Sequence, residues 1–304
     1  MHPTQRHACA LALSCSLFPL LSSAEEWTEF RGPGGQGHSA SENLPTEWST
    51  SKNVTWQASV PGIGWASPIV VAGKVYLTTA VEQGGGLSLR ALSYDAASGK
   101  NAWDTEIFAL PEAGKIHKKN SHASPTPIFE DGKVYVHFGH HGTACLEAAT
   151  GKVVWKQESL TYAPVHGNGG SPILVGDKLI FSCDAKENPF IVALNKATGE
   201  VAWKSDRQVE TKRPFSFSTP LAIEVNGKTQ VISPASGAVI AYDPDNGQEI
   251  WRCGYGEGYS VVPRPVYAHG LVYVCSGFNQ ATLFAIRPDG KGDVTNTHIV
   301  WQTS

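Results

Sequence analysis

The sequence predicts an all-β fold of repeated four-stranded antiparallel sheets, and two observations lead to that prediction. A phrase that turns on glycine and closes on tryptophan recurs about every 48 residues. Between its copies lie short segments rich in Val, Ile and Phe, separated by Gly, Asp and Asn turns, and none shows helical periodicity. Four short strands in each repeat are typical of the blades of a β-propeller.

The first 24 residues lie outside the repeat and are typical of an export signal. Arg6 and His7 precede an apolar run of about 14 residues, and small residues at 22–24 suit a cleavage site. The run is short for a membrane span, and no later segment reaches that length. We expect residues 1–24 to be a signal peptide and residues 25–304 to form the repeat domain of a protein exported to the periplasm or beyond.

The closing phrase predicts how neighbouring sheets meet. Its close copies are SYDAASGKNAW (93–103), CLEAATGKVVW (145–155), ALNKATGEVAW (193–203) and AYDPDNGQEIW (241–251). A looser copy, AIRPDGKGDVTNTHIVW, covers 285–301 with extra residues in its turn. The glycine allows a left-handed backbone, and the indole is large enough to fill the gap between two sheets. The predicted docking residues are Trp56, Trp103, Trp155, Trp203, Trp251 and Trp301.

Residues 171–203 show the strands expected in one repeat. The segments 171–175, 178–183, 190–194 and 201–203 are apolar, with Gly176-Asp177 as a two-residue hairpin turn. We expect blades to end near residues 56, 103, 155, 203, 251 and 301, giving about five full blades and a partial N-terminal one. Two arrangements remain open: a fragment of a seven- or eight-bladed propeller, or a smaller six-bladed ring that uses residues 27–56.

The pattern A-x-D-x-x-[ST]-G-x-x-x-W resembles the tryptophan-docking motif of the pyrroloquinoline-quinone (PQQ) repeat superfamily. The resemblance runs from about residue 27 to the end, and the segments WTEFRGPGGQGHS and HGNGGSP resemble exported planctomycete-type PQQ-like propellers. The superfamily holds eight-bladed quinoprotein alcohol dehydrogenases and non-enzymatic relatives, including the outer-membrane-assembly lipoprotein. The resemblance therefore implies either a binding and scaffold module or a PQQ-dependent oxidoreductase.

A similar phrase precedes the innermost strand of each repeat and ends in Pro68, Pro125, Pro172, Pro220 or Pro265. Because innermost strands surround the axis, the residues before these prolines should converge on one mouth of the channel. The loops between second and third strands lie at the same end. The predicted ligand-binding residues of this rim are Trp65, Asn120, His122, His140, His141, His166, Asn168, Arg213, Phe217 and Arg264.

The rim shows no recognisable metal or catalytic pattern. Its histidines lack metal-ligand spacing, so no metal is predicted. The quinoprotein resemblance implies calcium beside PQQ, an aspartate base and a vicinal Cys-Cys ring. The sequence has no Cys-Cys pair and no acidic residue in the rim phrases, so we predict no catalytic residue and favour binding of an envelope protein, a glycan or a small ligand.

Charge and cysteine content restrict the remaining options. The formal net charge is −3 with no basic run, which excludes nucleic acid as an expected partner. Cys145, Cys183, Cys253 and Cys275 follow the signal without C-x-x-C spacing. One or two disulfides are compatible with export, but the spacing assigns no pairing.

Overall fold

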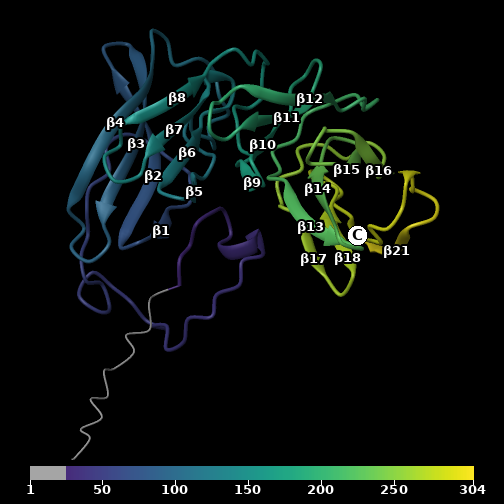
Figure 1. Ribbon diagram of the computed structural model, residues 1–304, viewed down its shortest axis with the longest axis horizontal. Helices are drawn as coiled ribbons and strands as arrows, with labels where there is room; N and C mark the ends of the chain where they lie inside the picture. The colour runs from purple at the N-terminus through teal and green to yellow at the C-terminus, as the bar shows by residue number, and fades with distance from the viewer. Residues whose placement is uncertain (1–24) are drawn as a thin grey trace, which may run out of the picture.

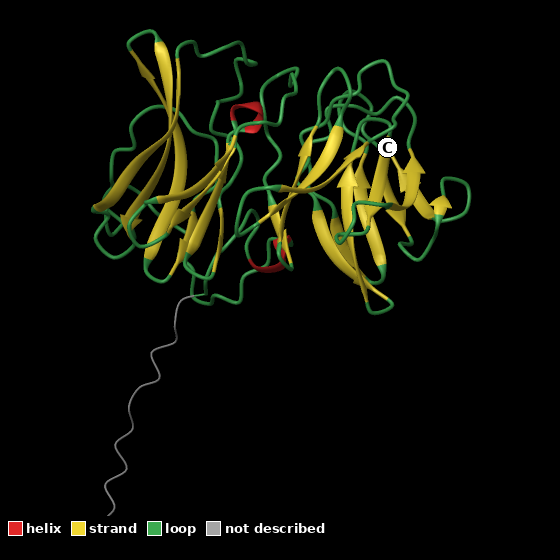
Figure 2. Ribbon diagram, turned by 45° about the horizontal axis from the view of Figure 1, so that its top comes forward, coloured by secondary structure: helices red, strands yellow, loops and turns green. Residues whose placement is uncertain are grey.

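The computed structural model describes residues 25–304, and the predicted signal at 1–24 lies outside the described residues. The all-β prediction is confirmed. The described chain contains 21 strands, and its helices are two single 3₁₀ turns, η1 (Pro33–Gly35) and η2 (Gly139–His141). Figure 2 shows these two turns in red among sheets joined by loops. No helix in residues 25–304 is long and apolar enough to cross a membrane.

The strands form five sheets, which we number as blades along the chain. Blade 1 comprises β1 (Ile69–Val71), β2 (Lys74–Gln83), β3 (Gly86–Asp95) and β4 (Asn101–Leu110). Blade 2 comprises β5 (Ile128–Glu130), β6 (Lys133–His137), β7 (Thr143–Glu147) and β8 (Val153–Gln157). Blade 3 comprises β9 (Ile173–Val175), β10 (Lys178–Cys183), β11 (Phe190–Asn195) and β12 (Val201–Asp206).

Blades 4 and 5 share one short strand. Blade 4 comprises β13 (Leu221–Val225), β14 (Lys228–Pro234), β15 (Ala238–Tyr242) and β16 (Glu249–Gly254). Blade 5 comprises β17 (Val266–Ala268), β18 (Leu271–Cys275), β19 (Leu283–Ile286) and β21 (Ile299–Thr303). The strand β20 (Gly292–Asp293) comes from the last turn of blade 5 but pairs in parallel with β16 of blade 4. The blades follow one another along an arc in Figure 1.

The middle strands of each blade are buried on both faces because a blade lies between two neighbours. In β10, Leu179 and Phe181 belong to the core shared with blade 2, whereas Ile180 belongs to the core shared with blade 4. The same alternation holds in β11 for Val192 and Ile191. Successive side chains on a strand point to opposite faces, so a strand buried on both sides has a nearly continuous apolar sequence.

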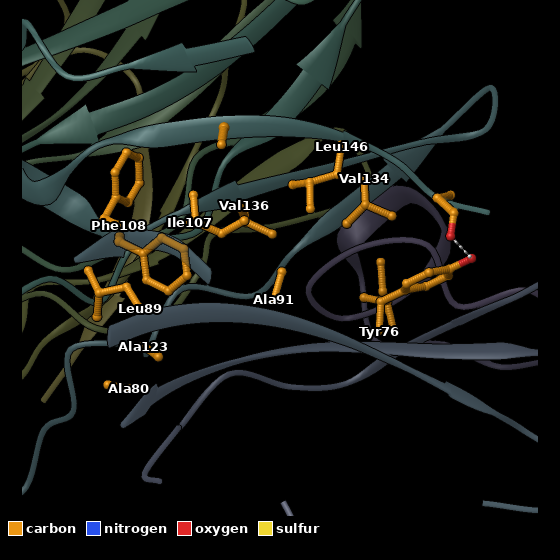
Figure 3. Close-up of a cluster of buried hydrophobic side chains, with 14 of the residues drawn as sticks. Tyr76, Ala80, Leu89, Ala91, Ile107, Phe108, Ala123, Val134, Val136 and Leu146 are labelled. Carbon is orange, nitrogen blue, oxygen red and sulfur yellow. Dashed lines mark hydrogen bonds between the residues drawn. The ribbon is translucent and has the colours of Figure 1, made fainter. Parts of the chain in front are cut away.

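Four apolar cores follow from this alternation, one between each pair of consecutive blades. The core between blades 1 and 2 joins Leu89 and Ile107 to Val134, Val136 and Leu146 (Figure 3). Figure 3 also shows the Tyr76 hydroxyl directed at the carbonyl of Ala148, in the closing turn of blade 2. The hydrophobic stabilisation is therefore distributed over the blade interfaces.

Four tryptophans meet the closing turn of the next blade in the same way. Their indole N–H groups donate to backbone carbonyls at 2.8–3.0 Å. The donor and acceptor pairs are Trp56 with Ala96, Trp103 with Ala148, Trp155 with Lys196 and Trp203 with Pro244. Each ring also lies against the turn glycine, so that a Cβ there would come within 2.5–2.6 Å of a ring atom.

The last two tryptophans depart from this pattern. Trp251 is fully buried, but its N–H donates to Oε1 of Gln230, a side chain of its own blade, at 2.9 Å. The longer fifth turn instead places β20 along β16, with Val294 in the same core. Trp301 is 42% exposed and its ring contacts Tyr273 of its own sheet, so the described chain does not show it in a blade interface.

Residues 27–36 connect blades that are far apart in sequence. Trp27 pairs through its backbone with Val70 of β1, and the carbonyl of Thr28 accepts from the N–H of Phe129 in β5. Glu29 forms a salt bridge with Arg264, which precedes blade 5. The segment thus contacts blades 1, 2 and 5, and it is the darkest purple loop between them in Figure 1.

Candidate ligand-binding site

The loops before the inner strands form a pocket of about 1080 Å³. Blade 2 contributes its entry segment around Asn120, and blade 3 contributes the segment around His166. Blades 4 and 5 contribute Phe217 and Ser260 from the equivalent segments, and the loop between β10 and β11 adds Lys186. Equivalent loops from four consecutive blades meet here because each blade repeats the same strand order around a common axis.

Neighbouring entry segments are pinned to one another by hydrogen bonds. The Asn120 amide donates to the carbonyl of His166 at 2.9 Å and to that of Asn168 at 3.1 Å. Between blades 4 and 5, the Phe217 N–H donates to the Val261 carbonyl at 2.8 Å. These bonds cross blade boundaries, so the wall of the pocket is held by the fold and does not depend on a ligand.

The pocket lining is rich in positive charge. Five lining side chains are Lys or Arg and none is Asp or Glu. These are Lys118, Lys119, Lys186, Lys212 and Arg213. None of them forms an ion pair within residues 25–304, whereas many other basic side chains do. The chain carries a net charge of −3, so this cationic surface is a local feature.

Aromatic rings form the apolar part of the wall. His166 makes an edge contact with Phe215 at 5.4 Å between centroids, and Phe215 makes another with Tyr259 at 5.7 Å. Tyr259 in turn contacts Phe278, which is 64% exposed at the opening. The Arg213 guanidinium lies 4.6 Å from the centroid of the Tyr259 ring. Arg213 also donates from Nη1 to the Tyr259 hydroxyl, so these contacts hold the arginine over the ring and leave its other N–H donors available.

The predicted rim residues fall into four groups. Asn120, His166, Arg213 and Phe217 line the pocket. Trp65 is 62% exposed and lies outside the pocket lining. Arg264 is buried and donates to Glu29 and to the carbonyl of Phe30, so its predicted place on a ligand-accessible rim is wrong. The N-terminal segment covers Arg264, and nothing in the rim phrase indicates this contact.

The remaining rim candidates gather beside the pocket in a cluster of imidazoles. His122 Nδ1 lies 3.3 Å from His141 Nε2, and the rings of His140 and His141 lie 3.8 Å apart between centroids. Asn168 accepts a hydrogen bond from the Tyr162 hydroxyl at 3.0 Å. The Nδ1 atom of His140 and the Nδ2 atom of Asn168 are buried and find no hydrogen-bond partner among residues 25–304.

Burial keeps these imidazoles neutral. Burial first, and then the nearby His140 and His122, lower the pKa of His141 to about 4. Burial also lowers the pKa of His122, and burial together with His122 lowers that of His140. Each ring therefore keeps a nitrogen lone pair at neutral pH.

The sequence prediction missed most of the pocket's charge and much of its aromatic wall. The lysines lie in the segments KIHKKN (115–120), DAKENP (184–189) and TKRPF (211–215), one or two to a loop. No basic run marks them, because three different blades bring them together. Phe215, Tyr259 and Phe278 likewise occur singly in loops, where the sequence shows no periodicity.

Comparison with known proteins places the chain among PQQ-repeat propellers. A family model described as outer membrane protein assembly factor BamB matches residues 88–302. A quinoprotein ethanol dehydrogenase of Pseudomonas aeruginosa is 30% identical over 148 residues, which are 43% of this chain and 23% of the relative. A tetrathionate hydrolase of Acidithiobacillus ferrooxidans is 23% identical over 239 residues, 72% of this chain and 47% of the relative.

Solved structures support the same architecture. The quinohemoprotein alcohol dehydrogenase of Comamonas testosteroni superposes with a TM-score of 0.63 at 15% identity, covering 92% of this chain and 49% of that one. A europium-containing methanol dehydrogenase gives a TM-score of 0.59 at 14% identity, covering 86% of this chain and 54% of that one. The chain spans about half the length of these relatives or less.

Proposed function

This chain belongs to the family described as outer membrane protein assembly factor BamB, and from that premise we propose that it is an exported binding module. Its ligand or partner segment would occupy the pocket formed by the entry loops of blades 2 to 5. One observation carries the proposal: five unpaired cations and a wall of aromatic rings surround one preformed pocket that no carboxylate lines. An envelope protein, a glycan or a small ligand remains the expected class of partner.

The lining favours an occupant that is negatively charged and has a flat apolar part. Lysine and arginine donate charge-assisted hydrogen bonds to carboxylate, sulfate or phosphate oxygens. The rings of Phe215, Phe217 and Phe278 offer surfaces against which a planar group can pack. The pocket volume of about 1080 Å³ suits a drug-sized molecule or a few residues of a peptide.

The proposal is tested with pyrene-1,3,6,8-tetrasulfonate, a planar polyanion whose fluorescence anisotropy reports binding, against uncharged 1-pyrenemethanol. We expect the tetrasulfonate to bind more tightly and to weaken as salt is added. Lys119→Glu and Lys186→Glu change exposed side chains of the lining and should each weaken binding by roughly twofold to tenfold. Lys228→Glu, an exposed lysine of β14 outside the lining, is the matched control.

Equal binding of the two pyrenes, or an equal effect of Lys228→Glu, would contradict a charge-selective pocket.

Export is tested separately by N-terminal sequencing of protein recovered from outside the cytoplasm. A chain that begins at Glu25 supports cleavage after Ala24.

The cationic and aromatic lining also favours a second candidate, because PQQ is a flat quinone with three carboxylates. The residues present do not fit the calcium that accompanies it, however. Calcium takes six to eight oxygen ligands, commonly from carboxylates. The pocket lining supplies no carboxylate, and the described residues contain no group of three or more His, Cys, Asp or Glu arranged for a metal ion.

The pocket lining therefore supports no catalytic step through PQQ. Titration with PQQ in the presence and absence of Ca²⁺, followed by a dye-linked alcohol oxidation assay, separates the two candidates. Calcium-dependent uptake with turnover would establish the oxidoreductase. Binding of PQQ without calcium dependence and without turnover would instead show that the pocket accepts PQQ only as another planar anion.

A further inference from the structure

The imidazole cluster beside the pocket is built from two loops that the fold brings together. His122 lies in the entry segment of blade 2, and His140 and His141 lie in η2 between β6 and β7. The spacing of 19 residues between His122 and His141 resembles no metal motif, which is why the sequence predicts none. The proximity of the two rings arises only when the blade has formed.

The separation of the two facing nitrogens is informative. His122 Nδ1 and His141 Nε2 are 3.3 Å apart. A hydrogen bond from a ring N–H is commonly about 2.9–3.0 Å long. Two nitrogens that each lie about 2.05 Å from one tetrahedral ion are about 3.3 Å apart. The two nitrogens are thus within reach of a long hydrogen bond, with the donor set by the tautomer, and their spacing also matches that of two ligands of one ion.

The surroundings of the pair suit a cation. Both rings are half-buried, so their orientations are restricted by packing. The His140 ring lies tilted against that of His141 with 3.8 Å between ring centroids, and its buried Nδ1 has no hydrogen-bond partner within residues 25–304.

We propose that His122 and His141 bind one transition-metal ion, with solvent or an external ligand completing its coordination. Imidazole nitrogen suits Zn²⁺, Cu²⁺ and Ni²⁺ and does not suit Ca²⁺ or Mg²⁺, so the site is distinct in chemistry from a quinoprotein calcium site. Two protein ligands leave coordination positions open, in keeping with the finding that no described group of three side chains is arranged for a metal. His140 acts as a positioning residue that holds the His141 ring.

The test titrates tag-free protein with Co²⁺ and Zn²⁺, because a histidine tag would itself bind them. We expect one equivalent of Co²⁺ to give visible d–d absorption that one equivalent of Zn²⁺ abolishes, and Ca²⁺ to have no effect. Removing a group that only orients a metal ligand lowers metal affinity about 10–100-fold. His122→Ala and His141→Ala each remove a ligand itself, so each should lower the Co²⁺ affinity at least about tenfold. His141→Gln repeats the test with a larger, polar side chain.

His117 and His166 supply the matched control. Their rings also make an edge contact, at 5.3 Å between centroids, and they line the neighbouring pocket. His117→Ala and His166→Ala should leave the Co²⁺ spectrum unchanged. Thermal melting of each variant shows whether it is folded. Absence of stoichiometric binding in the parent protein, or equal binding by folded His122→Ala and His141→Ala, would overturn the proposal.

Discussion

Trp203 and Trp251 each fill a blade interface, but their indole N–H groups bond to different partners. Trp203 donates to the carbonyl of Pro244 in the next blade's turn and lies against Gly247. Trp251 donates to the side chain of Gln230 in its own blade, and its backbone pairs with the extra strand β20. The repeat therefore specifies a bulky indole at the edge of each blade, but the turn that follows decides which group satisfies its N–H.

The difference originates in the length and composition of the turn. The four close copies keep a short turn whose glycine has a φ between +69° and +78°. The fifth copy has Arg287 at the position occupied by Asp95, Asn195 or Asp243 in other copies, and its extra residues extend to β20. The residue that follows β20, Val294, is buried in the same core as Trp251, which is 0% exposed whereas Trp203 is 8% exposed.

The largest expected effect is that of Trp251→Ala. Truncation of a buried tryptophan costs about 3–5 kcal/mol, and here it also leaves the Gln230 amide buried without its donor. Trp203→Ala removes a ring of similar burial, but the partner it leaves is a single backbone carbonyl of the next blade's turn. Urea midpoints of the two variants should both fall, with Trp251→Ala falling further. An equal or smaller fall for Trp251→Ala would show that the two interfaces are energetically equivalent.

Gly199→Ala tests the close-copy interface without changing its tryptophan. The added Cβ would lie 2.5 Å from the Trp155 ring, at a backbone φ of +78°. The left-handed backbone costs about 1–2 kcal/mol and overpacking adds about 1–3 kcal/mol. Gly176→Ala is the control from the same blade, because its φ is +57° but a Cβ there meets nothing within 4 Å. If both variants lose the same stability in urea, steric contact with the indole contributes nothing.

The sequence predicted these interfaces because the information is local. Turn glycine and closing tryptophan lie four residues apart in each of the four close copies, so a repeat search finds both. The partner of Trp251 was not predictable, because Gln230 lies 21 residues upstream in an ordinary strand. The pocket shows the same division between local and long-range information. The entry prolines indicated its position, but its charge was not predictable, because residues such as Lys186 and Arg213 come from loops of different blades. Arg264 illustrates the limit, since residues 27–36, more than 200 positions away, bury it.

Gln230→Met removes the side-chain acceptor that distinguishes Trp251, together with the hydrogen bond at 3.3 Å from the Gln230 amide to the carbonyl of Pro288. A buried donor left without an acceptor costs about 1–3 kcal/mol, and methionine preserves much of the glutamine volume. No comparable substitution exists for Trp56, Trp103, Trp155 or Trp203, whose acceptors are backbone carbonyls. Gln157→Met is the control, because Gln157 donates to the carbonyl of Gly199 at a close-copy interface without accepting from an indole. A smaller loss of urea midpoint for Gln230→Met than for Gln157→Met would contradict the assigned role.

The smallest expected effect concerns the acidic residue of the first close-copy turn. Asp95 accepts hydrogen bonds from the N–H and hydroxyl of Ser98 at 3.0 and 2.8 Å, and it pairs with Lys74 at 3.1 Å. The Ser98 hydrogen bonds, followed by Lys74, lower the pKa of Asp95 to about 2. Because the folded pKa lies below the unfolded value of 3.8, this contribution to stability is present above about pH 4 and is lost as the pH falls toward 2. Asp95→Asn should therefore lower the melting temperature slightly at pH 6, and the gap from the parent protein should close between pH 4 and pH 2.

Arg287 stands at this position in the fifth turn and has no carboxylate to titrate, so Arg287→Gln should show no such closing of the gap. A constant gap for Asp95→Asn from pH 6 to pH 2 would mean that the carboxylate does not hold the turn on which Trp56 docks.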